Sequence, residues 1–358
     1  MKDQPYIVIM AGGIGSRFWP YSKNSRPKQF LDVLGTGRTL LQMTFDRFLE
    51  LAKPEQFFVV TNQSHVHLVR EQLPELQENQ ILAEPLRKNT AACLAYASYK
   101  IACIDSNATM IVAPADHLIL QEGRFLQTLV AAISAAQEPN RLLTIGIKPN
   151  RPETGYGYIQ FLPASVATQV LKVKTFTEKP NAKLAAAFLE SGDFVWNSGL
   201  FVWKVSSLIE AFKNHMPDLA DAFEEGKGKL GSDLESDFIL TVYATLKNVS
   251  IDYGIMEKSD QVYMVLGDFG WSDIGSWQSL HELRDKDEDN NVVEANALLF
   301  DTKNCLIKTD SERLVVVQGM ENFLINESGN VLLICKLGEE NRFRDFVAQA
   351  KKKGEDFI

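Results

Sequence analysis

The chain has 358 residues, of which 45% are hydrophobic and 23% charged, and its formal net charge is −9. An acidic chain is a poor candidate for binding nucleic acid or anionic membrane surfaces. No apolar stretch is long enough to span a bilayer, and the short apolar run at the N-terminus indicates a strand rather than a signal peptide. The cysteines show no paired spacing, which is typical of reduced thiols. We therefore expect a cytoplasmic protein with no nucleic-acid and no membrane partner.

The first half of the chain has the pattern of an α/β fold. Continuous apolar runs alternate with amphipathic runs, which indicates a Rossmann-like, mostly parallel sheet with helices on both faces. Such sheets bind ligands at the carboxyl ends of their strands. The expected strands are Tyr6–Ala11, Phe57–Thr61, Ile81–Ala83, Thr109–Ala113 and Leu142–Ile147, and the expected helices lie near Leu40–Leu51, Ser64–Leu73, Thr90–Ile104 and Arg124–Gln137.

The second half predicts an insertion and a separate C-terminal domain. Residues 154–265 mix strands (157–161, 170–177 and 199–203) with helices, as expected of an insertion or lid on the same sheet, within a first domain of residues 1–290. From residue 291 to 358, short β runs separated by turn residues predict a small C-terminal β domain, for which a short β-helix is one candidate. A basic helix near 341–353 follows these runs. We expect the apolar residues of these β runs to form the interface of a homodimer.

A glycine-rich loop follows the first expected strand directly. Glycines let the backbone approach a polyphosphate, whose oxygens can accept hydrogen bonds from the exposed N–H groups. The loop lacks the ending of a Walker loop and has Phe18 in place of the third glycine of a dinucleotide fingerprint, so both of these classes are excluded. A turn that serves packing alone stays open as the alternative. The loop consists of Ala11, Gly12, Gly13, Ile14, Gly15, Ser16 and Arg17.

The residues after the loop carry a family resemblance. Residues 17–20 read RFWP and residues 26–30 read RPKQF. The run GGxGxRxWP…PKQF resembles the signature of the sugar-nucleotide pyrophosphorylases, in their mannose-1-phosphate guanylyltransferase branch. The resemblance, which extends over about the first 290 residues, implies that the glycine loop wraps a nucleotide and that Arg17 and Lys28 hold its phosphates. Outside such a motif, both side chains would be solvated loop charges.

Residues 84–91, which read EPLRKNTA, resemble the EPxxRNTA segment at the base pocket of the family. Asn89 is also a candidate N-cap of the following helix, and one residue can have both roles. Lys88 stands where the family often has arginine, and Ala92 where it often has proline. The nucleotide-binding residues implied by this segment and the loop are Ala11, Gly12, Gly13, Gly15, Ser16, Glu84, Pro85, Asn89 and Thr90.

Two acidic motifs resemble the metal-bearing motifs of the family. Residues 113–117 read APADH and resemble PADH, while residues 270–277 read GWSDIGSW and resemble WSDxGSW. The resemblance implies that Asp116 and Asp273 share a Mg²⁺ ion, which prefers a few hard oxygen ligands together with phosphates and water. Without this context, an aspartate before a helix is more often an N-cap. We expect His117 to shape its turn through local hydrogen bonds rather than to act in the chemistry.

Four further motifs resemble the sugar side of the family's site: ETGYGY at 153–158, FTEKP at 176–180, WNSG at 196–199 and SIDY at 250–253. A carboxylate and an amide suit a polyol, and a lysine suits a phosphate monoester. The resemblance places Glu178 and Asn197 on sugar hydroxyls, and Lys179 and Asp252 toward the phosphate. A surface ion pair is the alternative for the glutamate and the lysine. The implied sugar-phosphate residues are Gly155, Tyr156, Gly157, Glu178, Lys179, Asn197 and Asp252.

The resemblance implies transfer of GMP from GTP to mannose 1-phosphate, giving GDP-mannose and pyrophosphate with Mg²⁺ as cofactor. The enzyme could instead use another base or sugar phosphate. A regulatory relative that senses GDP-mannose is disfavoured because Arg17, Lys28, Asp116 and Asp273 are all present. A nicotinamide-dependent oxidoreductase is disfavoured by the incomplete fingerprint. Some bacterial relatives carry an additional isomerase domain, and we expect this chain to lack that activity.

Overall fold

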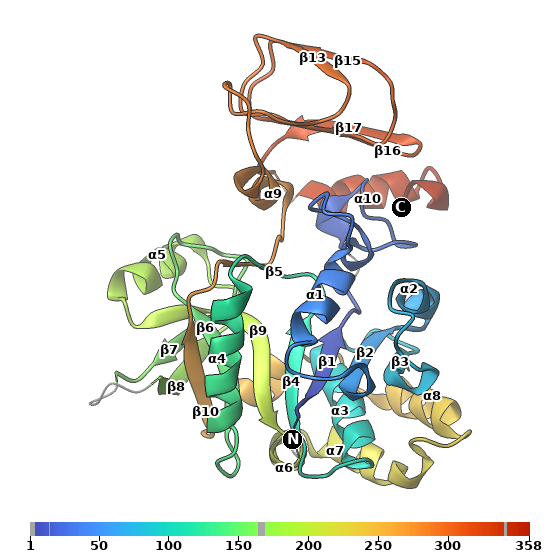
Figure 1. The fold of residues 1–358 in the computed structure, drawn as a ribbon, viewed down its shortest axis with the longest axis vertical. Helices are drawn as coiled ribbons and strands as arrows, with labels where there is room; N and C mark the ends of the chain where they lie inside the picture. The colour runs from blue at the N-terminus through green and yellow to red at the C-terminus, as the bar shows by residue number, and fades with distance from the viewer. Residues whose placement is uncertain (1–3, 14, 164–168, 340–341) are drawn as a thin grey trace. The chain divides into compact units, whose positions relative to one another are not determined.

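The computed structural model describes residues 4–13, 15–163, 169–339 and 342–358. Ile14 of the glycine loop and residue 341 of the expected terminal helix therefore lie outside the described residues. The chain divides into two compact units, one of Met1–Gly12 and Leu41–Trp271 and the other of Gly13–Leu40 and Ser272–Ile358 (Figure 1). Within the described ranges, no helix has the length and apolar character needed to cross a membrane.

A nine-stranded sheet lies at the centre of the described part of the first unit. Its strand order is β3-β2-β1-β4-β9-β6-β10-β8-β7, with a further pairing between β9 and β7. The apolar residues of β1 and β2 are buried because the sheet is covered on both faces. The strands are β1 (Tyr6–Met10), β2 (Phe57–Asn62), β3 (Ile81–Glu84), β4 (Thr109–Pro114), β6 (Leu142–Ile147), β7 (Tyr158–Phe161), β8 (Val170–Thr177), β9 (Phe194–Lys204) and β10 (Val262–Gly267), and the short strands β5 (Leu118–Ile119) and β11 (Trp271–Ser272) lie outside this sheet.

The sheet is mixed, which corrects the prediction of a mostly parallel sheet. Strands β3, β2, β1 and β4 are parallel to one another, and so are β6 and β10. In contrast, β9 is antiparallel to β4, β6 and β7, and β8 is antiparallel to β7 and β10. The antiparallel strands β8 and β9 both lie in the predicted insertion of residues 154–265, and β8 follows β7 without the crossover helix that a parallel pair requires.

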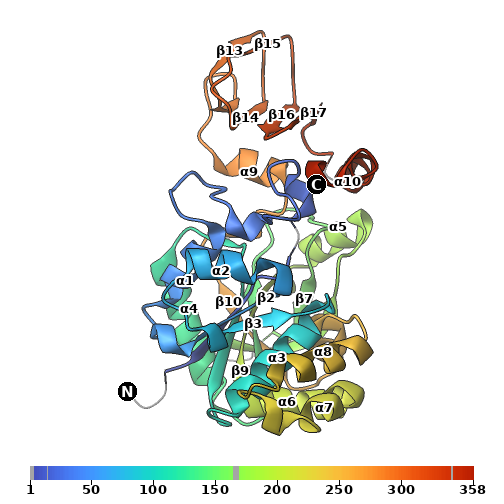
Figure 2. The same ribbon diagram turned by 90° about the vertical axis from the view of Figure 1, so that its right-hand side faces the viewer.

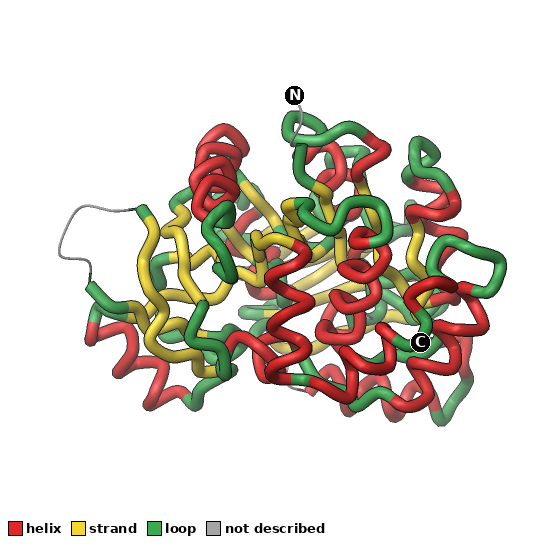
Figure 3. Tube along the Cα trace, turned by 90° about the horizontal axis from the view of Figure 1, so that it is seen from below, coloured by secondary structure: helices red, strands yellow, loops and turns green. Residues whose placement is uncertain are grey.

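Helices cover both faces of the sheet, as predicted. Figures 1 and 2 show α1 and α4 on one face and α3, α6 and α7 on the other, and in Figure 3 the strands lie between helices. In α6, Val205, Leu208 and Phe212 recur at helical spacing, and all three are fully buried against the sheet side. The helices of this unit are α1 (Leu40–Phe48), α2 (Val66–Gln72), α3 (Asn89–Ala102), α4 (Glu122–Ala135), α5 (Ala182–Ser191), α6 (Val205–His215), α7 (Pro217–Glu224), α8 (Glu235–Thr245) and the π-helix η7 (Asp252–Met256).

In the second unit, the segment after the glycine loop packs against the C-terminal end of the chain. The indole N–H of Trp19 donates to the carbonyl of Phe357 over 2.6 Å, and the rings of Phe18 and Trp277 lie 5.1 Å apart. Segments more than 250 positions apart thus share one core. The helices here are η1 (Ser16–Phe18), η2 (Lys28–Phe30), α9 (Trp277–Leu283) and α10 (Phe343–Lys351).

The C-terminal strands of the second unit alternate between two small sheets along the chain. One sheet has the order β12-β14-β16-β17 and the other pairs β13 with β15. All of these pairs are parallel except β16 with β17, which is antiparallel. Leu298 and Phe300 of β13 and Val316 of β15 are about half exposed; dimerisation at this surface stays a prediction, as does the domain boundary at residue 291. The strands are β12 (Val292–Glu294), β13 (Ala297–Phe300), β14 (Leu306–Thr309), β15 (Val315–Gln318), β16 (Phe323–Ser328) and β17 (Val331–Lys336).

Candidate active site

The start of the glycine loop lies beside the buried carboxyl group of Glu84. A Cβ atom added to Gly12 would lie 3.3 Å from Oε2 of Glu84, so the absence of a side chain lets the carboxyl approach the backbone. Tyr243 donates its hydroxyl to Oε1 of Glu84 over 3.0 Å. Ala11 is fixed by its N–H, which donates to the carbonyl of Val60 over 2.8 Å. Gly12, which follows β1, therefore lies next to Glu84 at the end of β3. Both are predicted nucleotide-binding residues.

The surroundings of Glu84 change its acidity. The residue is 8% exposed. Burial raises the pKa of Glu84 from its ordinary value of 4.5 to about 7, although the hydrogen bond from Tyr243 acts in the opposite direction. Near neutral pH the carboxyl can therefore be either a hydrogen-bond donor or an acceptor.

The beginning of α3 connects the nucleotide motif to the SIDY motif. Thr90 accepts a hydrogen bond from the backbone N–H of Ile251 over 2.8 Å. Asn89 has a positive φ of 68° and accepts the N–H of Thr90 over 2.8 Å. The helix begins at Asn89 itself and has Lys88 at the N-cap position, with no hydrogen bond from a capping side chain. The suggested capping role of Asn89 is therefore corrected, because its side chain bonds the adjacent amide rather than one deeper in the first turn.

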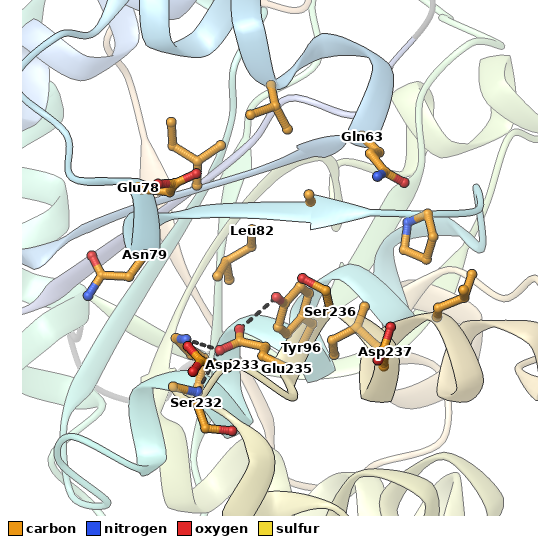
Figure 4. A pocket seen from close by; sticks show the side chains of 18 of the residues that line it. Gln63, Glu78, Asn79, Leu82, Tyr96, Ser232, Asp233, Glu235, Ser236 and Asp237 are labelled. Carbon is orange, nitrogen blue, oxygen red and sulfur yellow. Dashed lines mark hydrogen bonds and ion pairs between the residues drawn. The ribbon is translucent and has the colours of Figure 1, made fainter.

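A cavity of about 660 Å³ lies beside β3 and α8 (Figure 4). Glu235 accepts a hydrogen bond from the hydroxyl of Tyr96 over 2.7 Å and forms an ion pair with Lys100. These side chains therefore satisfy one another within the wall of the cavity. Of the predicted nucleotide-binding residues, Pro85 lines it, whereas Glu84 and Asn89 do not. The cavity is thus not formed by the predicted site as a whole.

The predicted sugar residues converge in the first unit. The amide Nδ2 of Asn197 donates to Oδ1 of Asp252 over 2.8 Å, and the backbone N–H of Asn197 donates to the carbonyl of Gly157 over 2.8 Å. A Cβ atom on Gly157 would lie 2.5 Å from Oε2 of Glu178, so this glycine gives the carboxylate its space. Lys179 forms an ion pair with Glu178. Two carboxylates, one amide and one ammonium thus come together in this unit. Glu178 and Lys179 follow β8, Asn197 lies on β9 beside the start of β7, and Asp252 begins η7.

An aromatic cluster holds the PADH turn. The indole N–H of Trp271 donates to Nδ1 of His117 over 3.2 Å. Because an indole N–H can only donate, the neutral ring of His117 carries its proton on Nε2, which lies 3.8 Å from Oδ1 of Asp116. Tyr156 packs edge-on against Trp271 and Trp196, with ring centroids 5.1 Å apart in each pair. The local role expected of His117 is therefore supported by its contacts. Gly155 lies one residue before this cluster, and its N–H donates to Oε1 of Glu153 over 2.9 Å.

In the second unit, Lys28 lies next to the loop that carries Asp273. Its ammonium donates to the carbonyls of Asp273 and Ile274 over 2.9 and 3.0 Å, and the residue is only 4% exposed. The N–H of Gly275 donates to Oδ1 of Asp273 over 2.8 Å, which orients that carboxylate. The structure thus brings the PKQF and WSDxGSW motifs together, and it excludes a freely solvated Lys28.

The loop residues from Gly13 onward belong to the second unit, and they differ in exposure. Gly15 has a φ of 59°, and a Cβ atom there would lie 2.9 Å from the backbone nitrogen of Lys28. A side chain at this position would therefore be excluded both by conformation and by space. The carbonyl of Gly13 accepts from Nε2 of Gln29 over 2.9 Å. Ser16 begins η1, and Arg17, which follows it, is exposed.

Two side chains that the motifs do not include support the site. Tyr243 of α8 bonds Glu84, and the hydroxyl of Thr144 on β6 lies 3.2 Å from Oδ1 of Asn197. Both stand in ordinary apolar runs of helix and strand, so no local signal distinguishes them.

Across the described residues, no group of three or more histidine, cysteine, aspartate or glutamate side chains could hold a metal ion.

A family model described as Nucleotidyl transferase matches residues 6–290. The chain therefore belongs to the nucleotidyl transferase family, and it is a nucleotidyltransferase enzyme. The match covers β1, the whole nine-stranded sheet and both acidic motifs.

Individual relatives agree with this family. The mannose-1-phosphate guanylyltransferase of Klebsiella pneumoniae is 37% identical over an alignment of 361 positions, which covers 98% of this chain and 73% of the relative. The alginate biosynthesis protein AlgA of Pseudomonas syringae pv. tomato is 35% identical over an alignment of 353 positions, which covers 97% of this chain and 72% of the relative. A solved structure from Thermus thermophilus, described as a mannose-1-phosphate geranyltransferase, is 31% identical with a TM-score of 0.86 and covers 97% of this chain and 99% of its own.

Proposed function

We propose that this chain transfers GMP from GTP to mannose 1-phosphate, giving GDP-mannose and pyrophosphate. The observation that carries the proposal is the convergence of Glu178, Asn197 and Asp252 around Gly157. Carboxylates and an amide in one place suit the hydroxyls of a sugar. A relative that is 37% identical is a mannose-1-phosphate guanylyltransferase, which supports this choice of sugar and base.

In the proposed reaction, an oxygen of the sugar phosphate forms a bond to the α-phosphorus of GTP. The bond from that phosphorus to the oxygen bridging toward the β-phosphate breaks in line, and pyrophosphate leaves. A phosphate monoester has a second pKa of about 6, so it is largely ionised at neutral pH and needs no general base. The protein then contributes by positioning both substrates and by offsetting their negative charge.

We assign the nucleotide to the loop after β1 and to the segment after β3. The amides of Gly12 and its neighbours would donate to phosphate oxygens. Glu84, beside Gly12, would meet the base, since a carboxyl with a pKa of about 7 can both donate and accept. Asn89 and Thr90 at the start of α3 complete this set.

The positive charge for the phosphates would come from Arg17 and Lys28. Arg17 is exposed, so its guanidinium is accessible to a ligand. The ammonium of Lys28 is held by two backbone carbonyls, and it would contribute its charge from that fixed position. Lys179, paired with Glu178, would meet the phosphate of the sugar.

Asp116 and Asp273 are the proposed ligands of Mg²⁺. Both offer hard carboxylate oxygens, and Oδ1 of Asp273 is already oriented by the N–H of Gly275. A pair of carboxylates fits this ion, because Mg²⁺ usually takes one or two of them together with substrate phosphates and water. When bound, the ion would offset the charge of the phosphates of both substrates.

The proposal is tested by measuring pyrophosphate release with each of the common nucleoside triphosphates and a panel of sugar 1-phosphates. GTP with mannose 1-phosphate should give the highest kcat/KM. A higher value for another pair would revise the base or the sugar. Absence of pyrophosphate release from every pair would refute nucleotidyl transfer to these sugars.

A further inference from the structure

The orientation of the Asn197 side chain is fixed by the protein. The backbone N–H of Gly199 donates to Oδ1 of Asn197 over 3.2 Å. A backbone N–H can only donate, so the oxygen of the amide faces Gly199. The nitrogen consequently faces Asp252, whose Oδ1 accepts from Nδ2 over 2.8 Å.

This orientation decides what Asn197 can offer to a ligand. Its Nδ2 carries two N–H groups, of which one is donated to Asp252. Its Oδ1 is engaged with Gly199 and lies 3.2 Å from the hydroxyl of Thr144. The second N–H is therefore the group that remains for a ligand, which makes Asn197 a donor to a sugar oxygen.

The carboxylate of Asp252 also interacts electrostatically with that of Glu178. The interaction between these two carboxylates is one cause of the raised pKa of Asp252. Two neighbouring carboxylates accept hydrogen bonds from hydroxyls, and they repel the oxygens of a phosphate. Two carboxylates outweigh the one ammonium of Lys179, which is paired with Glu178. This surrounding therefore suits the hydroxyl end of the sugar better than the phosphate end, where the motif alone suggested Asp252.

We propose that Asp252 is a positioning residue that holds the Asn197 amide with one N–H toward the sugar, at the hydroxyl end of the subsite. This inference rests on the proposed function, since it specifies how the sugar is held. Asp252 thus acts on the sugar through Asn197.

The acidity of Asp252 provides a way to observe this arrangement. Burial, and then the charge of Glu178, raises the pKa of Asp252 to about 6, whereas the Asn197 hydrogen bond, its own backbone and Lys179 lower it. Glu257 also feels the charge of Glu178: burial, and then Glu178, raises the pKa of Glu257, whereas Lys258 lowers it. Below about pH 6, Asp252 gains a proton and becomes a weaker acceptor for Nδ2.

The first test compares Asp252→Asn with Glu257→Gln as a matched control. Both changes remove one negative charge near Glu178, but Asp252 alone of the two bonds the Asn197 amide. Asp252→Asn should raise KM for mannose 1-phosphate by about tenfold or more and change KM for GTP by less than about twofold. Glu257→Gln should leave both constants within about twofold of the wild type. Equal increases in both KM values for Asp252→Asn would overturn the inference.

The second test does not depend on turnover. The side-chain amide signals of Asn197 in ¹⁵N-resolved spectra of the unliganded protein, identified by their loss in Asn197→Ser, should move with a midpoint near pH 6. They should not titrate there in Asp252→Asn. Signals of the wild type that stay fixed from about pH 5 to 7 would overturn the placement of Asp252. If the wild type releases no pyrophosphate, the proposed function fails, and these spectra still decide the contact.

Discussion

Replacing Glu84 with glutamine tests the buried carboxyl of the proposed nucleotide site. The pKa of this group rises from 4.5 in its ordinary state to about 7 in the folded protein, chiefly through burial. The folded protein therefore binds the proton more tightly than the unfolded chain. The resulting stabilisation is complete below about pH 4.5 and is lost as the pH rises through about 7.

The size of the effect follows from the same values. One pKa unit corresponds to about 1.4 kcal/mol, so the gap between 4.5 and 7 is worth about 3 kcal/mol. Glutamine cannot ionise, and its oxygen can still accept the hydroxyl of Tyr243. Relative to the wild type, Glu84→Gln should therefore gain about 2–3 kcal/mol in free energy of unfolding when the pH is raised from about 5 to 8.

Urea denaturation followed by tryptophan fluorescence measures this difference at both pH values. Glu78→Gln is the control, because Glu78 precedes the same strand but has a side chain that is 84% exposed. Its difference from the wild type should not depend on pH. If the free energies of unfolding of Glu84→Gln and the wild type differ by the same amount at both pH values, the burial of an ionisable carboxyl at this position is refuted.

Three further predictions concern the phosphates, the sugar and the metal. Lys28→Met should lower kcat by about 100-fold or more and also lower the melting temperature, because the buried ammonium bonds two carbonyls; wild-type pyrophosphate release and melting would contradict this. Gly157→Ala should raise KM for the sugar phosphate by about tenfold with little effect on KM for GTP, because the new Cβ would lie 2.5 Å from Oε2 of Glu178; equal effects on both substrates would contradict the sugar subsite. EDTA should abolish activity and Mg²⁺ restore it, and the double variant Asp116→Asn, Asp273→Asn should be little worse than either single variant. EDTA-resistant turnover, or fully additive losses, would contradict a shared ion.

Strands and helices with strong periodicity could be predicted from the sequence. The observed limits of β6 and β8 are those expected, and α3 differs by one or two residues at its ends. The strand β10 was not predicted, and β9 begins at Phe194 rather than at Gly199. Local periodicity gives no information on which strands pair, so the antiparallel half of the sheet could not be predicted from it.

The polar motif WNSG shows why β9 was predicted too short. Asn197 and Ser198 interrupt the apolar pattern, and a polar pair normally indicates a loop. Both lie within the strand because their side chains have partners there: Ser198 donates to the carbonyl of Ile145 over 2.7 Å, and Asn197 bonds Asp252. Polar residues that find hydrogen-bond partners within a buried strand therefore hide that strand from a pattern based on hydrophobicity.

The residues of the candidate site could likewise be predicted only in part. The motifs that resemble the family contain Glu178, Asn197 and Asp252, and the structure brings these residues together. The partners that fix them, such as Thr144, come from segments without a distinctive pattern. The contact of the Lys28 ammonium with two backbone carbonyls also depends on tertiary structure, which motif spacing does not contain.

The central claim is the attack of mannose 1-phosphate on the α-phosphorus of GTP. Incubation of the enzyme with GTP carrying a radioactive α-phosphate, mannose 1-phosphate and Mg²⁺ tests it directly, with the products separated by ion-exchange chromatography. We predict that the label appears in GDP-mannose and that one unlabelled pyrophosphate is released for each molecule formed. Label that stays in GTP, or that appears in free GMP or GDP with no sugar attached, would contradict the account.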